Sequence, residues 1–361
     1  MMPTNEWNWE EVAGGPDIAA QGYPCAMALD RNDAPQIAFS NTCFRPPNDY
    51  VLGRKLDSTW SFRTLLPRPG IEGAAVSLAI DSKNHSHLAY IVNRSGDRSE
   101  IWYENDDGTE VVERVSIPAK RAFAVCVLVD SNDNPRIVFG DGFPDTELWQ
   151  CWRSSSANGQ WTASKLVSST DWQVGYLSAA FDADDRLHLA CYDKERHALR
   201  YGVSHTADWH FEIVETSAPQ DAGLHPSLAI DSFGMPVICH GMNSFDTTAK
   251  LRIARFDGHH WKCETIAAML RGTACSLALD SHDRPLVVYR SHANQELMLA
   301  FCDATGKWNE AVIFRDMGDP TAPSLQIDRA DRPHVAVARY YFDHDYDMRL
   351  WYGRRTMPVI R

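Results

Sequence analysis

The sequence predicts an all-β protein that folds as a seven-bladed β-propeller of four-stranded antiparallel blades, with the last blade closed by the N-terminal strand. Three observations predict this fold. A short phrase that ends in aspartate, with an apolar pair before it in six of its seven copies, recurs at intervals of 48 to 52 residues. Each interval holds short alternating apolar segments separated by turns, without a helical period. The fourth segment that the seventh unit lacks is found at the start of the chain.

The first segment of each unit ends at the recurrent aspartate. In the fifth unit it reads Ser-Leu-Ala-Ile-Asp over residues 227–231. An aspartate between a strand and polar residues is a typical turn former, because its carboxylate accepts hydrogen bonds from the backbone amides that follow. We therefore expect the seven aspartates to anchor hairpins on the face opposite any functional site. They are Asp30, Asp81, Asp130, Asp182, Asp231, Asp280 and Asp328.

Two small residue patterns accompany this aspartate. A serine often precedes the apolar pair, and a histidine follows the aspartate by six residues in three units. We expect these histidines to be structural or exposed. The serines are Ser77, Ser178, Ser227, Ser276 and Ser324, and the histidines are His87, His188 and His334.

Three further segments complete a unit. A second apolar segment follows the turn and a third follows a longer connection, as at 286–289 and 296–301. A tryptophan leads the fourth segment in five units. The second unit has Asp-Gly-Thr-Glu at 107–110 in its place, so its outer strand is expected to pack differently. The tryptophans are Trp60, Trp161, Trp209, Trp261 and Trp308.

The ends of the chain predict a closed ring. The seventh unit has three segments, the last near 350–352, whereas residues 6–12 read Glu-Trp-Asn-Trp-Glu-Glu-Val, the pattern of a fourth segment. Pairing them would close the ring and remove an exposed edge. We therefore predict one domain over residues 1–361. The blade cores are expected at 22–66, 73–117, 122–168, 175–216, 223–267, 272–315 and 321–355, the last with 6–13.

Composition excludes several classes of function. The chain has 35 Lys and Arg against 48 Asp and Glu, a net charge of −13. An acidic chain is a poor binder of nucleic acid or anionic lipid, because phosphate neutralisation supplies most of that affinity. The longest apolar run, residues 122–129, is too short to span a membrane. We expect neither nucleic acid nor membrane as a partner.

Cysteine usage and the N-terminus favour a cytoplasmic location. The nine cysteines include no Cys-x-x-Cys pair, and most lie in strand-like segments, which favours buried reduced thiols over disulfides or a metal site. The first twenty residues contain no Lys or Arg and no continuous apolar stretch, so no export signal is predicted. No motif implies a cofactor, and none predicts a metal.

The repeats resemble a known class of protein. The phrase Ser-Leu-Ala-Ile-Asp-Ser at 227–232, with a proline and a strand ending in Tyr or Phe after it in several units, resembles the repeats of bacterial seven-bladed propellers of the BNR (bacterial neuraminidase repeat) type. The resemblance spans nearly the whole chain, although the sialidase signature Ser-x-Asp-x-Gly-x-Thr-Trp is absent. It implies kinship with propeller polysaccharide lyases, glycoside hydrolases and lectins. The lyases use His with Tyr and Arg near the channel mouth, but their motifs match no position here, so no residue is transferred.

Departures from the repeat indicate the functional site, because repeated positions are explained by packing. Six residues before the aspartates, where small residues prevail, Tyr176 and His225 stand out; nine residues after, His240 replaces an apolar or aromatic residue. Eleven residues after, the second strand should end at the ligand face. The polar residues at this position of the seven units, or next to it, are Asn41, Asp141, Tyr192, Asp193, Arg290, His292, Arg339 and Tyr340. We call the residues at one equivalent position of the seven units a column.

These residues suggest acid–base chemistry on a sugar. His225, His240, Tyr192 and Tyr340 are the candidate catalytic groups, since a His or Tyr can move a proton near neutral pH. Arg290 or Arg339 can pair with a substrate carboxylate, as elimination from a uronic acid requires. The remaining residues are candidate substrate contacts. They are Arg290, Arg339, Asp193, Asp141, Tyr176, His292 and Asn41.

Alternatives remain open at this point. Asp141 and Asp193 would serve glycoside hydrolysis if their separation fits, and an ordinary polar rim explains the same residues. Acids and a histidine at 343–347 suit a cation, although a long solvated loop explains them equally. A single-site enzyme acting on an acidic or polar oligosaccharide is favoured, because the polar residues are specific to single blades. A glycan-binding lectin and a protein-interaction scaffold are the alternatives; the scaffold requires an exposed apolar patch.

Overall fold

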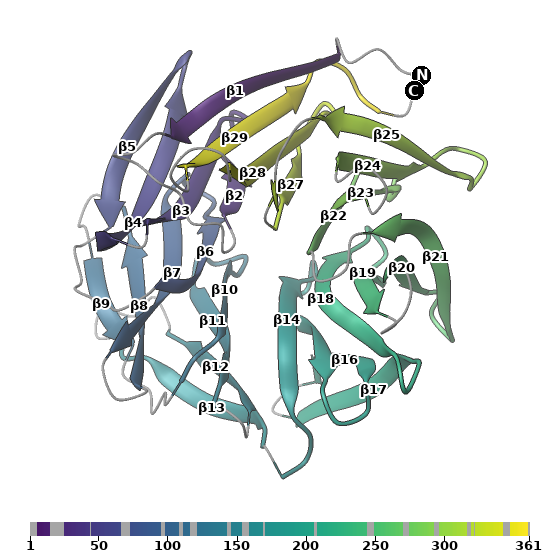
Figure 1. Cartoon of the computed structure of the whole chain (residues 1–361). Helices are drawn as coiled ribbons and strands as arrows, with labels where there is room; N and C mark the ends of the chain where they lie inside the picture. Colours follow the sequence, from purple (N-terminus) through teal and green to yellow (C-terminus); the bar gives the residue numbers. More distant parts are fainter. Residues whose placement is uncertain are drawn as a thin grey trace.

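A computed structural model of the chain contains seven antiparallel sheets arranged around a central axis (Figure 1). It describes residues 6–14, 25–43, 45–65, 73–94, 98–107, 111–115, 121–142, 146–153, 159–168, 170–205, 208–243, 249–269, 274–291, 296–315, 319–320, 322–341 and 347–359. The described residues form strands and turns without an α-helix, so the predicted all-β, seven-bladed propeller is confirmed.

Each of the first six blades consists of four consecutive strands, from the innermost to the outermost. Blades 1 to 3 contain β2 (Ala26–Leu29), β3 (Pro35–Cys43), β4 (Arg45–Leu56), β5 (Thr59–Leu65); β6 (Gly73–Ile80), β7 (Ser86–Arg94), β8 (Arg98–Asn105), β9 (Val111–Val115); β10 (Ala124–Val129), β11 (Pro135–Asp141), β12 (Glu147–Trp152) and β13 (Thr162–Val167). Blades 4 to 6 contain β14 (Val174–Phe181), β15 (Leu187–Asp193), β16 (Ala198–His205), β17 (Asp208–Thr216); β18 (Asp221–Ile230), β19 (Pro236–Asn243), β20 (Ala249–Phe256), β21 (Trp261–Met269); β22 (Cys275–Leu279), β23 (Pro285–Arg290), β24 (Leu297–Cys302) and β25 (Trp308–Phe314).

The N-terminal strand completes blade 7. This sheet comprises β1 (Trp7–Gly14), β26 (Asp319–Pro320), β27 (Ser324–Ile327), β28 (Pro333–Tyr341) and β29 (Asp347–Arg355). β1 pairs antiparallel with β29, from Trp7 opposite Arg355 to Gly14 opposite Arg349. The strands nearest the two ends of the chain, β1 and β29, consequently lie side by side in Figure 1. The predicted ring closure is confirmed.

Apolar side chains fill the spaces between blades. One cluster joins blades 5 and 6 through Leu251, Ile253, Val287 and Tyr289, all nearly inaccessible to solvent. Equivalent clusters join other neighbouring blades, so the core is a ring of interfaces. Serine hydroxyls add polar links between inner strands: Ser227 Oγ accepts a hydrogen bond of 3.0 Å from the Leu277 amide. The same bond joins Ser77 to Val127, Ser178 to Leu228, Ser276 to Leu325 and Ser324 to Met27.

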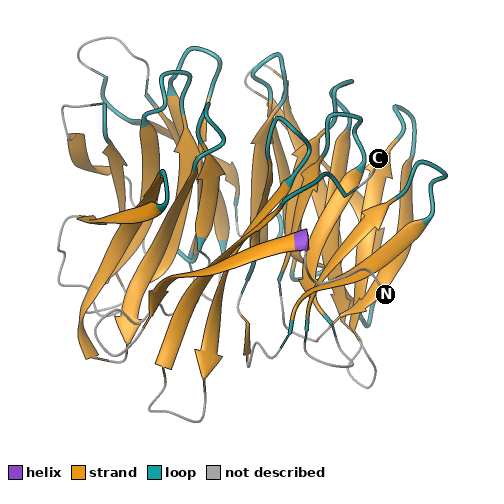
Figure 2. Cartoon of the chain, turned by 90° about the horizontal axis from the view of Figure 1, so that it is seen from above, coloured by secondary structure: helices purple, strands orange, loops and turns teal. Residues whose placement is uncertain are grey.

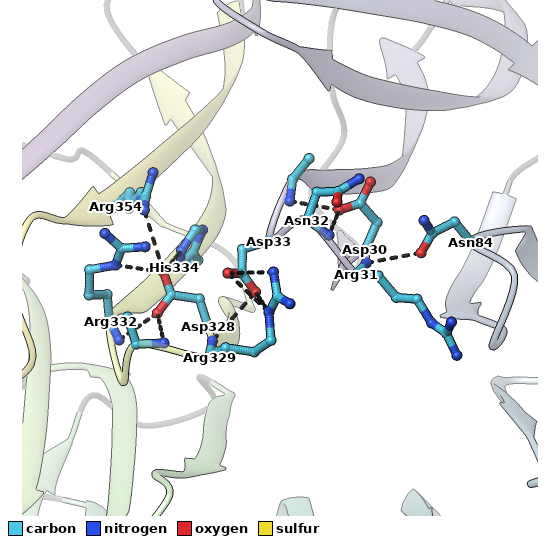
Figure 3. Close-up of polar contacts among 12 residues, drawn as sticks. Asp30, Arg31, Asn32, Asp33, Asn84, Asp328, Arg329, Arg332, His334 and Arg354 are labelled. Carbon is cyan, nitrogen blue, oxygen red and sulfur yellow. Dashed lines mark hydrogen bonds and ion pairs between the residues drawn. The ribbon is translucent and has the colours of Figure 1, made fainter.

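All seven recurrent aspartates anchor hairpins, as predicted. Asp30 Oδ1 accepts hydrogen bonds of 2.7 Å from the Asn32 amide and 2.9 Å from the Ala34 amide, and the other six make the same pair of bonds (Figure 3). These turns join the first and second strand of every blade. We call the side of the ring that they form the aspartate face, and the other side the site face. Figure 2 shows the strands running between the two sides.

The three recurrent histidines are structural. His188 Nε2 lies 3.0 Å from Asp182 Oδ2, and its Nδ1 lies 2.5 Å from the Tyr201 hydroxyl. His334 bridges Asp328 and Tyr352 in the same way. All three, His87 included, are at most 3% exposed, so of the two expected alternatives the structural one is confirmed. His188 and His334 each link the inner three strands of their blade.

Candidate functional site

Strand register places the candidate residues on the site face. Antiparallel pairing sets the end of each second strand beside the beginning of the inner strand, as Asp193 opposite Val174 and Arg339 opposite Pro320. The positions six before and eleven after the aspartates therefore lie at the same end of the blades. The hairpin aspartates lie at the other end.

Irregularities in two inner strands bring Tyr176 and His225 together. The register shifts between Val174 and Leu177 in β14, and between Leu224 and Ser227 in β18, so each residue lies within a bulge. His225 has a φ of 47°, a conformation unusual for a non-glycine residue. The two rings lie 3.8 Å apart between centroids, at 33°. Neighbouring blades thus present a Tyr–His pair, with Tyr176 40% exposed.

The imidazole of His225 is neutral at physiological pH. Burial of the ring lowers its pKa to about 4, because the charged form loses solvation. A neutral imidazole beside an exposed ring can accept a hydrogen bond or a proton from a bound molecule.

A second polar group lies behind this pair. The Tyr192 hydroxyl donates a 2.5 Å hydrogen bond to Asp221 Oδ1, and His197 Nδ1 lies 2.6 Å from the same oxygen. Burial and the Asp221 carboxylate raise the pKa of Tyr192, so this phenol keeps its proton. Gly175 allows the arrangement, since a Cβ there would lie 2.6 Å from the Tyr192 ring.

Sequence reasoning missed Asp221 and His197. Asp221 lies ten residues before Asp231, outside the columns in which departures from the repeat stand out, and His197 lies in the turn between β15 and β16. The available signal was the short connection between these strands, which fixes His197 at the site face; His197 has a φ of 52°.

His240 supports the site from beneath. The side chain is fully buried, its Nδ1 accepts a 3.0 Å hydrogen bond from the Gly223 amide, and its Nε2 lies 3.0 Å from Glu215 Oε2. Because Nδ1 accepts, Nε2 holds the proton and donates to Glu215. Glu215 also forms an ion pair with Arg252. It is a further residue that the sequence did not indicate. His240 therefore holds the start of β18, which bears Asp221 and His225, and does not reach the surface.

The two candidate carboxylates are buried anchors. Asp193 is fully buried and accepts a 2.6 Å hydrogen bond from Arg200 Nε, together with bonds from the Glu195 and Arg196 amides. Asp141 is 3% exposed and accepts a 2.7 Å bond from the Arg121 amide. An acid–base pair for glycoside hydrolysis must flank the scissile bond. The burial of both groups gives that alternative no support.

The remaining candidates extend around the ring. Arg290 ends β23 in blade 6 and is 6% exposed, and Arg339 lies in β28 of blade 7, half-buried. Asn41 and Tyr340 lie at the site-face ends of β3 and β28, where the structure describes the backbone alone. His292 and the acidic segment 343–346 lie outside the described residues. The structure thus brings together Tyr176, His225 and Tyr192.

Two further features bear on the alternatives. Within the part of the chain that the structure describes, no group of three or more His, Cys, Asp and Glu is placed to hold a metal ion, and no helix is long and apolar enough to cross a membrane. The exposed large apolar or aromatic side chains among the described residues belong to blades 1, 4, 5 and 7. They are Leu56, Phe62, Tyr176, Ile213, Phe233 and Met357.

Comparison with solved structures shows which proteins share this fold. The chain matches the polysaccharide lyase Uly1 with a TM-score of 0.67 and 9% identity over 96% of this chain and 92% of that one. It matches a PL25 ulvanlyase bound to -[GlcA(1-4)Rha3S]- with a TM-score of 0.66 and 11% identity over 94% and 95%. It also matches an α-L-arabinanase from Penicillium chrysogenum, with a TM-score of 0.55 and 9% identity over 80% and 94%.

These structural neighbours are carbohydrate-active proteins, and a sialidase and a lectin are also among the matches. At these identities the likeness shows the fold alone. No family model matches the sequence, and no curated protein does either. Membership of the BNR type therefore stays a prediction.

Proposed function

We propose that the protein is a carbohydrate-active enzyme with one site on the site face, where blades 4 and 5 meet, and that it cleaves an acidic oligosaccharide by elimination. The observation that supports this most is the contact between Tyr176 and His225. They are the large polar residues in a column otherwise filled by proline and alanine, and their rings lie 3.8 Å apart. The lyases among the structural neighbours, one bound to a glucuronate-containing sugar, agree with this proposal.

The chemistry follows from the protonation states. In the proposed elimination, neutral His225 takes the proton on the carbon next to the uronate carboxyl group. That C–H electron pair forms a carbon–carbon double bond, the bond to the glycosidic oxygen breaks, and the Tyr176 hydroxyl donates a proton to the departing oxygen. Arg290 or Arg339, in the next blades, would pair with the carboxylate. Tyr192, Asp221 and His240 are positioning residues in this scheme.

The test is a screen of uronate-containing polysaccharides, read by the ultraviolet absorbance of the unsaturated product and by new reducing ends. We expect both signals with at least one substrate. His225→Asn should lower kcat/KM by about 10²-fold or more, the usual contribution of general base catalysis. Asparagine tolerates the left-handed backbone at this position, so the melting temperature should change little.

The control is Phe233→Ala, which alters a 79% exposed side chain in a turn of the aspartate face and should retain full activity. Full activity of His225→Asn would overturn the proposal. Reducing ends without absorbance would indicate hydrolysis. Retention on immobilised glycans without product, abolished by Tyr176→Ala, would indicate a lectin, which the exposed Tyr176 ring also suits.

A further inference from the structure

A cavity lies between blades 2 and 3 on the aspartate face, at the other end of the strands from the site described above. Its volume is about 360 Å³, within the range of small-molecule sites. Blade 2 lines it with Asp81, His85, His87 and Asn105, and blade 3 contributes Arg153 among others.

The cavity coincides with a difference between blade 2 and blades 4 and 7, the other two blades that carry the buried histidine. Four residues after the hairpin aspartate, blades 4 and 7 have Arg186 and Arg332, whose Nε donates to that aspartate at 2.6 and 2.7 Å. Blade 2 has the shorter His85 there, with Nδ1 2.9 Å from Asp81 Oδ2. The smaller side chain leaves the volume that the guanidinium occupies in blades 4 and 7.

His85 also displaces the buried histidine from its aspartate. His87 Nε2 lies 3.5 Å from Asp81 Oδ2, whereas the corresponding distances in blades 4 and 7 are 3.0 and 3.2 Å. A distance of 3.5 Å exceeds that of a good hydrogen bond. The Nε2 atom of His87 is buried without a hydrogen-bond partner among the described residues.

An unpaired acceptor lies next to this donor. Asn105 is directly opposite His87 in the pairing of β7 with β8, so both side chains project from the same face of the sheet. Its Oδ1 is also buried and, within the described residues, lacks a hydrogen-bond partner. In blade 4 the residue opposite His188 is the apolar Val203, which offers no side-chain acceptor. Buried polar atoms of this kind are costly unless a water or a ligand satisfies them.

The protonation state of His87 follows from its other contact. Its Nδ1 lies 2.7 Å from the Tyr103 hydroxyl, and burial raises the pKa of Tyr103, so that the phenol keeps its proton and donates it. Burial also lowers the pKa of His87. The neutral ring therefore has its proton on Nε2. Nε2–H is a donor and Asn105 Oδ1 is an acceptor, on two opposite residues of a strand pair that both line the cavity.

Charges around the cavity are paired. Arg153 forms an ion pair with Glu113 and lies 5.1 Å from the centroid of the Tyr103 ring, and Lys83 Nζ lies 3.2 Å from Asp133 Oδ2. Asp81 accepts hydrogen bonds from two backbone amides and from His85. Since the cations and these acids already have partners, the cavity favours a neutral ligand over an anion.

We propose that this cavity binds a small neutral polyhydroxylated molecule, of the size of one sugar residue or polyol, through His87 Nε2–H and Asn105 Oδ1. A hydroxyl group satisfies both atoms, because it accepts from the imidazole and donates to the amide oxygen. The Tyr103 and Arg153 side chains line the same cavity. This site is independent of the proposed enzymatic function.

The test is a titration of the full chain with neutral probes, in which ligand-observed NMR measures binding. The probes are glucose, galactose, rhamnose, glycerol and myo-inositol. We expect saturable binding of at least one probe. His85→Arg copies blades 4 and 7 and should fill the cavity, so binding should weaken at least tenfold while the melting temperature does not fall. Asn105→Val copies blade 4 and should also weaken binding at least tenfold.

The matched control is Phe233→Ala, an exposed side chain of blade 5 that does not line the cavity, which should bind the probe as the unmodified chain does. Two results would overturn the proposal. One is the absence of saturable binding for all five probes, which means that the cavity holds water only. The other is unchanged binding by both His85→Arg and Asn105→Val in folded protein.

Discussion

Two histidines of this protein have a pKa well below the usual value. His334 is fully buried between Asp328 and Tyr352, and His225 lies within the β18 bulge. Burial lowers the pKa of both to about 4, and for His334 the hydrogen bond to Asp328 opposes that shift only in part. The same desolvation thus keeps both imidazoles unprotonated at neutral pH, one within a structural bridge and the other at the site face.

These shifts predict how stability depends on pH. The unfolded chain takes up a proton on each histidine near pH 6.5, whereas the folded chain does so near pH 4. The unfolded state therefore binds more protons between these values, and the free energy of unfolding falls as pH decreases from 6.5 to 4. The loss should reach roughly 2–3 kcal/mol for the fully buried His334, at about 1.4 kcal/mol per pKa unit.

Urea unfolding at a series of pH values between 4 and 7.5 measures this slope. His334→Gln keeps a polar side chain without a titrating ring, so its stability should vary less over that interval even if its absolute stability is lower. A slope in the Gln variant equal to that of the unmodified chain would assign the pH dependence to other groups.

Part of the site was predictable from single residues. Tyr176 and His225 depart from columns of small residues, and a large side chain at a crowded mouth must project toward solvent. His240, Asp193 and Asp141 depart from their columns equally, yet they are buried supports. Their partners Glu215 and Arg200 are distant in sequence or lie across a strand pair. Whether such a side chain is buried and paired depends on those partners. A comparison of equivalent positions in the seven units does not reveal them.

At the scale of elements, the aspartate turns form links between blades. The residue three positions after each hairpin aspartate has a positive φ, and at most junctions its side chain accepts from the turn of the preceding blade. Asp283, for example, accepts 2.9 and 2.5 Å bonds from the amide and hydroxyl of Ser232. Blade 5 has Gly234 at this position and blade 4 has Ala183 opposite, so neither side chain can make the link.

Restoring this link is a direct test of its energy. Gly234→Asp has space, since a Cβ added there would lie 3.7 Å from its nearest neighbour, Arg186 Nη2, and aspartates occupy the left-handed conformation at φ 57–63° in the other turns. Each single change, Ala183→Ser or Gly234→Asp, should be neutral or destabilising. Together they should show a favourable coupling of about 1 kcal/mol, the net value of the one hydroxyl–carboxylate hydrogen bond that requires both side chains.

A double-mutant cycle in urea unfolding measures that coupling. Strict additivity of the two changes would show that the turn-to-turn bonds contribute nothing to cohesion between blades.

The strands and turns were predictable from the sequence, because their positions repeat in every unit. The serine and aspartate bonds between blades were not, because they join residues about fifty positions apart.

At the scale of the whole molecule, β1 joins three blades. It pairs with β29 of its own blade, Trp9 Nε1 donates a 2.9 Å hydrogen bond to the Ile313 carbonyl of blade 6, and Glu10 accepts a 3.0 Å bond from Trp60 Nε1 of blade 1. Gly353 permits this packing, since a Cβ there would lie 2.6 Å from the Trp9 ring. The split of blade 7 between the chain ends was predictable from the strand count alone. The seventh unit lacks one segment and the start of the chain has one to spare, so pairing the two gives seven complete blades.

Deletion of residues 1–14 should therefore affect the entire ring. It removes the outer strand of blade 7, exposes the edge of β29, and withdraws the Trp9 ring from Phe314, whose centroid lies 4.6 Å away. Loss of a fully buried aromatic side chain costs about 3–5 kcal/mol, and the half-buried Trp9 should contribute part of that. We expect a melting temperature lower by about ten degrees or more, or aggregation through the exposed edge, measured by circular dichroism and light scattering.

Adding the peptide of residues 1–14 to the truncated chain separates closure from mere loss of packing. If β1 closes the ring, the peptide binds only the folded state and raises the melting temperature in proportion to the logarithm of its concentration. A peptide with Trp9→Ala lacks the contacts to blade 6 and should raise it less. Unchanged melting of the truncated chain without peptide would show that six complete blades and the remaining strands of blade 7 hold the ring together by themselves.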